Sequence, residues 1–141
     1  MRKLILLVVL ALLTSTFAVA ADASPFKTGA KVYIGAMPDG FDTYLRAAFE
    51  KKKVPISVVD AKDKADFELR GQSDTQKASN AKKLIMLDWH SDEQATIAIA
   101  NIATGEVVYS YAVFKKSSAH GKQSTAEACA KHIKENLESK K

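Results

Sequence analysis

The chain has 141 residues, of which 21 are basic and 16 acidic, giving a formal net charge of +5. This modest excess, carried by lysines scattered along the chain, excludes the concentrated basic surface of a nucleic-acid-binding domain. A single cysteine, Cys129, excludes an intrachain disulfide, so packing must stabilise the fold.

The first 20 residues have the layout of a secretory signal peptide. Arg2 and Lys3 precede an apolar run over 4–13, and 18–20 reads Ala-Val-Ala, the small residues that signal peptidase requires. We expect cleavage between residues 20 and 23. The alternative is an uncleaved anchor, since the apolar stretch is barely long enough to span a bilayer.

Cleavage changes both the charge and the expected location of the protein. Loss of Arg2 and Lys3 takes the basic count from 21 to 19 against 16 acids, a net charge of +3. Cys129 lies far from the cleavage site, so it is not a lipid-modified N-terminal cysteine. We therefore expect a periplasmic or secreted protein without a stable membrane anchor.

After a leader over 21–30, residues 31–141 predict a single domain. Residues 31–36 favour a strand, because β-branched and aromatic side chains precede a turn at 37–40. A helix is expected over 41–53, with Asp39 as its N-cap, and Pro55 limits its extension. Its apolar face has helical spacing and consists of Phe41, Tyr44, Leu45, Ala48 and Phe49.

Two short strands are expected next, at 56–60 and 66–70. The second alternates charged and apolar residues, which is typical of a half-exposed strand near a sheet edge. Its charged residues Asp66, Glu68 and Arg70 are candidates for binding a partner strand. The polar segment 71–83 predicts a loop.

The next part of the chain predicts an antiparallel meander. Its strands are expected at 84–89, 94–102 and 106–115, separated by turns at 90–93 and 103–105. Apolar residues on both sides of 106–115 indicate a central strand covered on both faces.

The last element is a helix over 124–139. Ser124 and Glu127 have the spacing of a capping box at its start. Its buried stripe consists of Ala126, Cys129, Ala130, Ile133 and Leu137. The expected fold class is therefore α/β (α+β), a mixed sheet packed against two helices in the order β-α-β-β-(β-β-β)-α.

Two constellations around histidine can carry chemistry. Cys129 and His132 lie one helical turn apart and can form an activated thiolate or half a metal site, but Cys129 lies in the apolar stripe and is interpreted as a buried structural cysteine. His90 has Asp92 and Glu93 beside it and is a candidate metal site, or equally a solvated turn. No metal or other cofactor is expected.

The remaining features are weaker. Ser117 and Ser118 near His120 lack the surroundings of a hydrolase nucleophile. Gly35 and Gly40 follow the first strand without a nucleotide-binding pattern, although the helix start can attract an anion. A stacking face for sugar or peptide is possible, while core packing is the more usual role for strand aromatics; the residues are Tyr33, Trp89, Tyr109, Tyr111 and Phe114.

The layout resembles a family of small exported proteins. After the first strand and helix come Val-Pro-Ile-Ser-Val-Val-Asp over 54–60 and Ala-Asp-Phe-Glu-Leu-Arg-Gly over 65–71. This is similar to the group of the curli-secretion lipoprotein and the penicillin-binding-protein activator lipoprotein, whereas 104–108 and 121–132 are similar to segments of uncharacterised exported bacterial proteins. The lipidation cysteine of the lipoproteins is absent here. The resemblance implies a noncatalytic domain that binds partners in the cell envelope.

We therefore expect an exported, noncatalytic envelope protein that binds or assembles with an unidentified protein partner. The alternative is a small exported hydrolase or metal-dependent enzyme that uses His90 or the pair Cys129 and His132.

Overall fold

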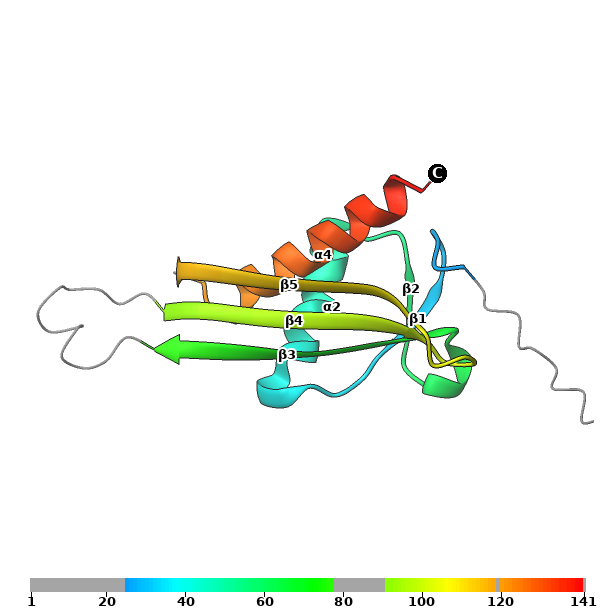
Figure 1. The fold of residues 1–141 in the computed structure, drawn as a ribbon, viewed down its shortest axis with the longest axis horizontal. Helices are drawn as coiled ribbons and strands as arrows, with labels where there is room; N and C mark the ends of the chain where they lie inside the picture. Colours follow the sequence, from blue (N-terminus) through cyan, green and yellow to red (C-terminus); the bar gives the residue numbers. More distant parts are fainter. Residues whose placement is uncertain (1–24, 78–90, 119, 141) are drawn as a thin grey trace, which may run out of the picture.

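The computed structural model describes residues 25–77, 91–118 and 120–140. Five strands form one sheet in the order β2-β1-β3-β4-β5, and two α-helices lie together on one of its faces (Figure 1). The strands are β1 (Lys31–Ile34), β2 (Ser57–Val59), β3 (Phe67–Lys77), β4 (Ser91–Asn101) and β5 (Val107–Ser118). The helices are α2 (Phe41–Lys52) and α4 (Lys122–Glu138), with 3-10 turns η1 (Pro38–Gly40) and η2 (Lys62–Lys64). The predicted mixed sheet with two packed helices is confirmed.

The core follows from the two-residue period of the strands. Leu69 lies opposite Ile34 on β1 and opposite Ile99 on β4, and Ile99 lies opposite Tyr109 on β5. These positions align across four strands on the face that the helices cover, so their apolar side chains form one layer. Phe26, before β1, joins this core by packing edge-on against Phe67.

The strand containing 66–70 lies inside the sheet, so the prediction that it is an edge strand is wrong. β3 pairs in parallel with β1 and antiparallel with β4. Charged and apolar residues alternate along β3 because the helices cover only one face of the sheet. Phe67 and Leu69 point into the core, whereas Arg70 is exposed on the bare face.

The loop predicted over 71–83 is also wrong for 71–77, which continue β3 and pair with β4 as far as Ser91. The polarity of this segment was misleading because its core-facing positions hold small residues. A Cβ on Gly71 would lie 2.7 Å from the Thr96 carbonyl oxygen, and Ser73 is buried. Similarly, 91–93 belong to β4 instead of a turn. The strand predicted over 84–89, residue 90 and the rest of the loop lie outside the described residues.

β5 is an edge strand, which corrects the prediction of a central strand covered on both faces. Val107 and Phe114 are 58% and 56% exposed on it. A register shift between Ile99 and Ala100 leaves Val108 as an extra residue in β5. Val108 and Tyr109 consequently both pack against the core, an arrangement that strict alternation does not predict.

Helix α2 ends where it was expected but begins differently. Lys53 adopts a left-handed conformation with φ 52° and terminates the helix just before Val54 and Pro55. At the other end the N-cap is Gly40 with φ 69°, and Asp39 makes no side-chain capping bond, so the predicted Asp39 cap is wrong. Tyr44, expected on the buried face, is exposed.

Helix α4 begins at Lys122, after Gly121, so the capping box is wrong as well. Ser124 already lies inside the helix, where its Oγ accepts a hydrogen bond from Lys115 Nζ at 2.8 Å. The predicted buried stripe is confirmed at every position. Neither α2 nor α4, the two α-helices in the described part of the chain, is long and apolar enough to cross a membrane.

Candidate functional site

Cys129 is fully buried in the stripe of α4. Burial raises the pKa of its thiol to about 12, because the ionised form would lose its hydration. A nucleophilic cysteine needs the opposite shift, toward the thiolate. The buried environment therefore supports the interpretation of Cys129 as a structural residue.

His132 has two partners, neither of which is Cys129. Its ring stacks on Tyr111 with the centroids 4.3 Å apart, and its Nδ1 lies 3.2 Å from Glu135 Oε2. The stacking on Tyr111 joins the exposed side of α4 to β5, whereas the contact with Glu135 lies within α4. They fix the orientation of the imidazole without directing it at the Cys129 thiol.

Of the candidate metal residues His90, Asp92 and Glu93, only Glu93 has a described side chain. His90 and the side chain of Asp92 lie outside the described residues, whereas Glu93 is buried in β4 close to Gly121 at the start of α4. Within the described ranges, no three His, Cys, Asp or Glu side chains gather as metal ligands would. Ser117 and Ser118 end β5, and His120 is exposed just before α4.

The described aromatic residues do not share one face. Tyr109 and Tyr111 pack against the core under α4, whereas Phe114 lies on the bare face beside Gln94. Trp89 lies outside the described residues. The predicted stacking platform is thus divided between the two sides of the sheet.

Two of the charged residues predicted for partner binding, Glu68 and Arg70, pair with each other. Glu68 accepts a hydrogen bond from Arg70 and lies 2.9 Å from Lys62 Nζ, and these cations lower the pKa of its carboxyl group. Asp66 precedes β3 and its backbone bonds to neighbouring segments. The backbone of Phe67–Leu69 is paired with β1 on one side and β4 on the other, so these three residues present no free strand edge. A role for the three side chains stays a prediction.

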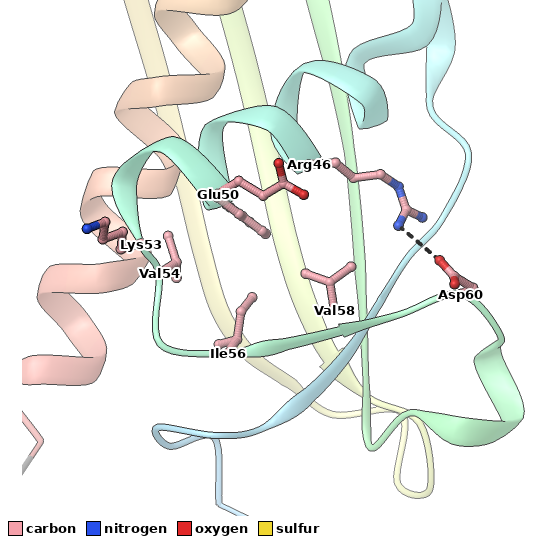
Figure 2. Close-up of a pocket in the computed structure, with 8 residues that line it drawn as sticks. Arg46, Glu50, Lys53, Val54, Ile56, Val58 and Asp60 are labelled. Atoms are coloured by element: carbon pink, nitrogen blue, oxygen red, sulfur yellow. Dashed lines mark ion pairs between the residues drawn. The ribbon is translucent and has the colours of Figure 1, made fainter.

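Sequence reasoning missed a hollow of about 520 Å³ between α2 and the segment 54–60 (Figure 2). We call this hollow the α2–β2 groove. It is lined by Arg46, Phe49, Glu50, Lys53, Val54, Ile56, Val58 and Asp60. Ile56 and Val58 point from the strand side toward α2, and Phe49 and Val54 are buried. The floor is therefore apolar.

Charged residues border this apolar floor. Arg46 Nη2 donates a hydrogen bond of 2.9 Å to the Ile34 carbonyl oxygen, which fixes the guanidinium at one end of the groove. Its Nη1 lies 3.9 Å from Oδ1 of the fully exposed Asp60, a contact too long for a hydrogen bond. Glu50 lies along the helix wall and Lys53 at the far end (Figure 2). The groove thus combines apolar contact area with fixed charges, which suits binding more than chemistry.

The groove exists because the helix layer is narrower than the sheet. β2 is an edge strand, and α2 does not fully cover it, so Val58 remains 39% exposed on the helix side. Two signals in the sequence marked the groove. Arg46 and Glu50 are spaced one helical turn apart, and Ile56 and Val58 are two residues apart in an extended segment.

The arrangement defines a two-layer α+β domain, with one face of a mixed sheet covered by two helices and the other face bare. Solved structures share this fold. PelC from Paraburkholderia phytofirmans, a dodecamer, aligns with a TM-score of 0.56 and 16% identity over 82% of this chain and 91% of its own. A DUF330 protein from Xanthomonas campestris aligns with a TM-score of 0.52 and 11% identity over 85% of this chain and 93% of its own.

TolB from Acinetobacter baumannii gives a TM-score of 0.51 and 8% identity over 81% of this chain, which corresponds to only 30% of TolB. No family model matches the sequence, and no curated protein matches it. At these identities the likeness establishes the fold alone. The resemblance to the curli-secretion and penicillin-binding-protein activator lipoproteins stays a prediction.

Proposed function

We propose that this chain is an exported, noncatalytic protein of the bacterial cell envelope that acts by binding another envelope protein. The α2–β2 groove carries this proposal. It presents apolar side chains beside a positioned guanidinium, at an edge of the sheet that the fold itself leaves uncovered. Such a surface gains free energy when a partner removes its apolar carbon from water.

Two further observations support binding over catalysis. The Cys129 thiol has a raised pKa, and His132 contacts Tyr111 and Glu135; both observations disfavour an activated nucleophile formed by this pair. The fold also suits protein–protein contact, since PelC, which shares it, is a dodecamer. Export follows from the signal-peptide pattern over 1–20, with the mature protein in the periplasm or secreted.

Site-specific photo-crosslinking in cells tests the proposal. A benzoylphenylalanine at Val58 is compared with one at Val107, an exposed apolar strand residue at the other edge of the sheet. We expect a discrete protein adduct from position 58 and none from 107. An absence of adducts at 58, or adducts of equal yield at both positions, would contradict a binding role for the groove. Mass spectrometry of the purified protein checks cleavage between residues 20 and 23.

A further inference from the structure

We propose that the occupant of the α2–β2 groove is an amphipathic α-helix of a different protein. Its apolar stripe covers Ile56 and Val58, and its flank carries an acid, a base and an acid in that order. This inference rests on the proposed function and names the chemistry of the partner.

A helix fits because the groove is the missing part of the helix layer. Val58 lies opposite Val32, which is fully buried, although both side chains are on the same face of the sheet. The difference arises because α2 covers β1 but not the outer strand β2. A helix lying beside α2 would complete the layer over β2, just as α2 and α4 pack together over the rest of the sheet.

The flank of α2 determines the charges of that helix. Arg46 and Glu50 are at positions i and i+4 on one side of α2, and Lys53, the residue that terminates the helix, follows them in the groove lining, so the charges have the order positive, negative, positive (Figure 2). A neighbouring helix with the order acid, base, acid places an opposite charge beside each. The order reads the same in both directions, so either helix direction is compatible.

A helix from a second copy of this chain does not combine a free apolar stripe with a flank of suitable charges. The apolar stripes of α2 and α4, the chain's described α-helices, are already buried in their own core. Apart from Phe49, which is buried in its own core, the groove side of α2 offers charged side chains to Ile56 and Val58. Covering these two residues with charges would cost desolvation free energy without a compensating apolar contact. A partner helix with its own free apolar stripe avoids this cost.

The two kinds of contact have different roles. Exposed ion pairs contribute little each, so the three charges select and orient the helix. The apolar stripe over Ile56 and Val58 supplies most of the affinity. Reversing all three charges of a bound helix should therefore weaken binding about tenfold, whereas removing the apolar floor should abolish it.

The test uses two fluorescein-labelled, hydrocarbon-stapled helical peptides of 16 residues with the same Leu/Ile stripe. One carries Glu-x-x-x-Lys-x-x-Glu on its flank and the other the inverse, Lys-x-x-x-Glu-x-x-Lys. Fluorescence anisotropy with the purified mature protein is expected to show about tenfold tighter binding of the first peptide. Equal binding of both peptides, or binding of neither, overturns the inference.

Variants establish where the peptide binds. Arg46→Glu/Glu50→Lys/Lys53→Glu is expected to reverse the preference, and Val58→Asp to weaken both peptides at least tenfold, whereas the control Val107→Asp changes neither. Because Arg46 bonds to Ile34, the double variant Glu50→Lys/Lys53→Glu provides a test with this bond intact. It inverts two of the three charge pairs and should therefore remove the preference for the first peptide and give a weaker preference for the second. A preference that survives in a folded double variant overturns the inference.

The two proposals fail separately. A crosslinked protein at position 58 together with equal peptide binding leaves the proposed function standing and overturns the charge-matched helix. A crosslinked adduct with the mass of two copies of this chain also overturns the inference, because the occupant is then the chain itself.

Discussion

Lys51 Nζ on α2 lies 2.7 Å from Glu127 Oε1 on α4, so a single carboxylate connects the two helices. Lys52 Nζ lies 3.4 Å from the other oxygen, and Gln123 Nε2 donates a hydrogen bond of 3.0 Å to Oε1. The hydrogen bonds from Lys51 and Gln123 are the main causes that lower the pKa of Glu127 to about 2. Glu127, which the sequence predicted to belong to a capping box, instead connects the two helices.

Glu127→Gln is expected to lower the free energy of unfolding at pH 7 by about 1 kcal/mol, since the lysines are partly solvated. The folded pKa lies below the usual value of 4.5, so the carboxylate stabilises the fold fully above about pH 4.5. This contribution is lost as the pH falls toward 2. Urea unfolding should therefore show a smaller difference between variant and wild type at pH 3 than at pH 7. Glu138→Gln, which removes a more exposed pair to Lys134, is the control and should change little.

Cys129 should resist thiol reagents in the native protein and react only as the protein unfolds, because its side chain is fully buried. The rate of labelling by dithionitrobenzoate is expected to follow the rate of unfolding. Glu106→Cys in a Cys129→Ala background provides an exposed thiol for comparison and should react at once. Rapid labelling of Cys129 without unfolding would contradict the structural assignment.

The thiol also has a consequence at alkaline pH. Its folded pKa of about 12 lies above the usual 9.0, so the neutral thiol favours the fold below pH 9, and this contribution is lost as the pH rises toward 12. Wild type should therefore lose stability over this range relative to Cys129→Ala, as measured by urea unfolding at pH 7, 9 and 10. Parallel pH curves would show that the thiol does not titrate differently in the folded state.

Gly71→Ala is expected to destabilise the protein by about 2 kcal/mol, because the new methyl group must displace backbone. Its Cβ would lie 2.7 Å from the Thr96 carbonyl oxygen and 2.9 Å from Ile97 Cγ2. Gly35→Ala is a matched control, since the nearest atom is at 3.6 Å. Chemical denaturation of both variants measures the difference, and equal stabilities would mean that β3 and β4 are not so close at Gly71.

The two faces of the sheet should respond differently to substitution. Ile97→Ala removes a fully buried side chain in β4 and is expected to cost about 2–5 kcal/mol. Phe114→Ser, on the bare face of β5, should change stability by no more than about 0.5 kcal/mol. Thermal unfolding distinguishes the two outcomes. A large loss in the Phe114 variant would indicate that this face is covered in solution.

The sequence predicted the elements better than their places in the sheet. Helical spacing identified the stripe of α4 at every position, and Pro55 marked the end of α2, because both depend on near neighbours. Sheet position depends on distant residues. The alternation of charged and apolar residues around Glu68 reflects the uncovered face of the sheet, but a strand at the edge of a sheet shows the same pattern. The apolar sides of β5 were misread because Val108 is an extra residue that reverses the alternation.

The candidate site was the least predictable part. Arg46 and Val58 belong to different elements, and only the parallel pairing of β1 with β2 brings their segments together. The periodicity of each segment was visible in the sequence, but nothing showed that α2 would leave the outer strand uncovered. By contrast, the exclusion of a disulfide and the interpretation of Cys129 as buried required only the number and spacing of residues.

The position of β3 between a parallel and an antiparallel neighbour has a consequence for the order of folding. β3, β4 and β5 pair with strands adjacent in sequence, whereas Val32 on β1 must find Phe67 on β3, some 35 positions later. If the N-terminal part of the chain becomes available for folding first, β1 and α2 are present before the strand that completes their side of the sheet. Their apolar faces stay exposed until β3 is available. A substitution that delays β3, such as Gly71→Ala, should therefore reduce the yield of folded protein more than its equilibrium stability alone implies.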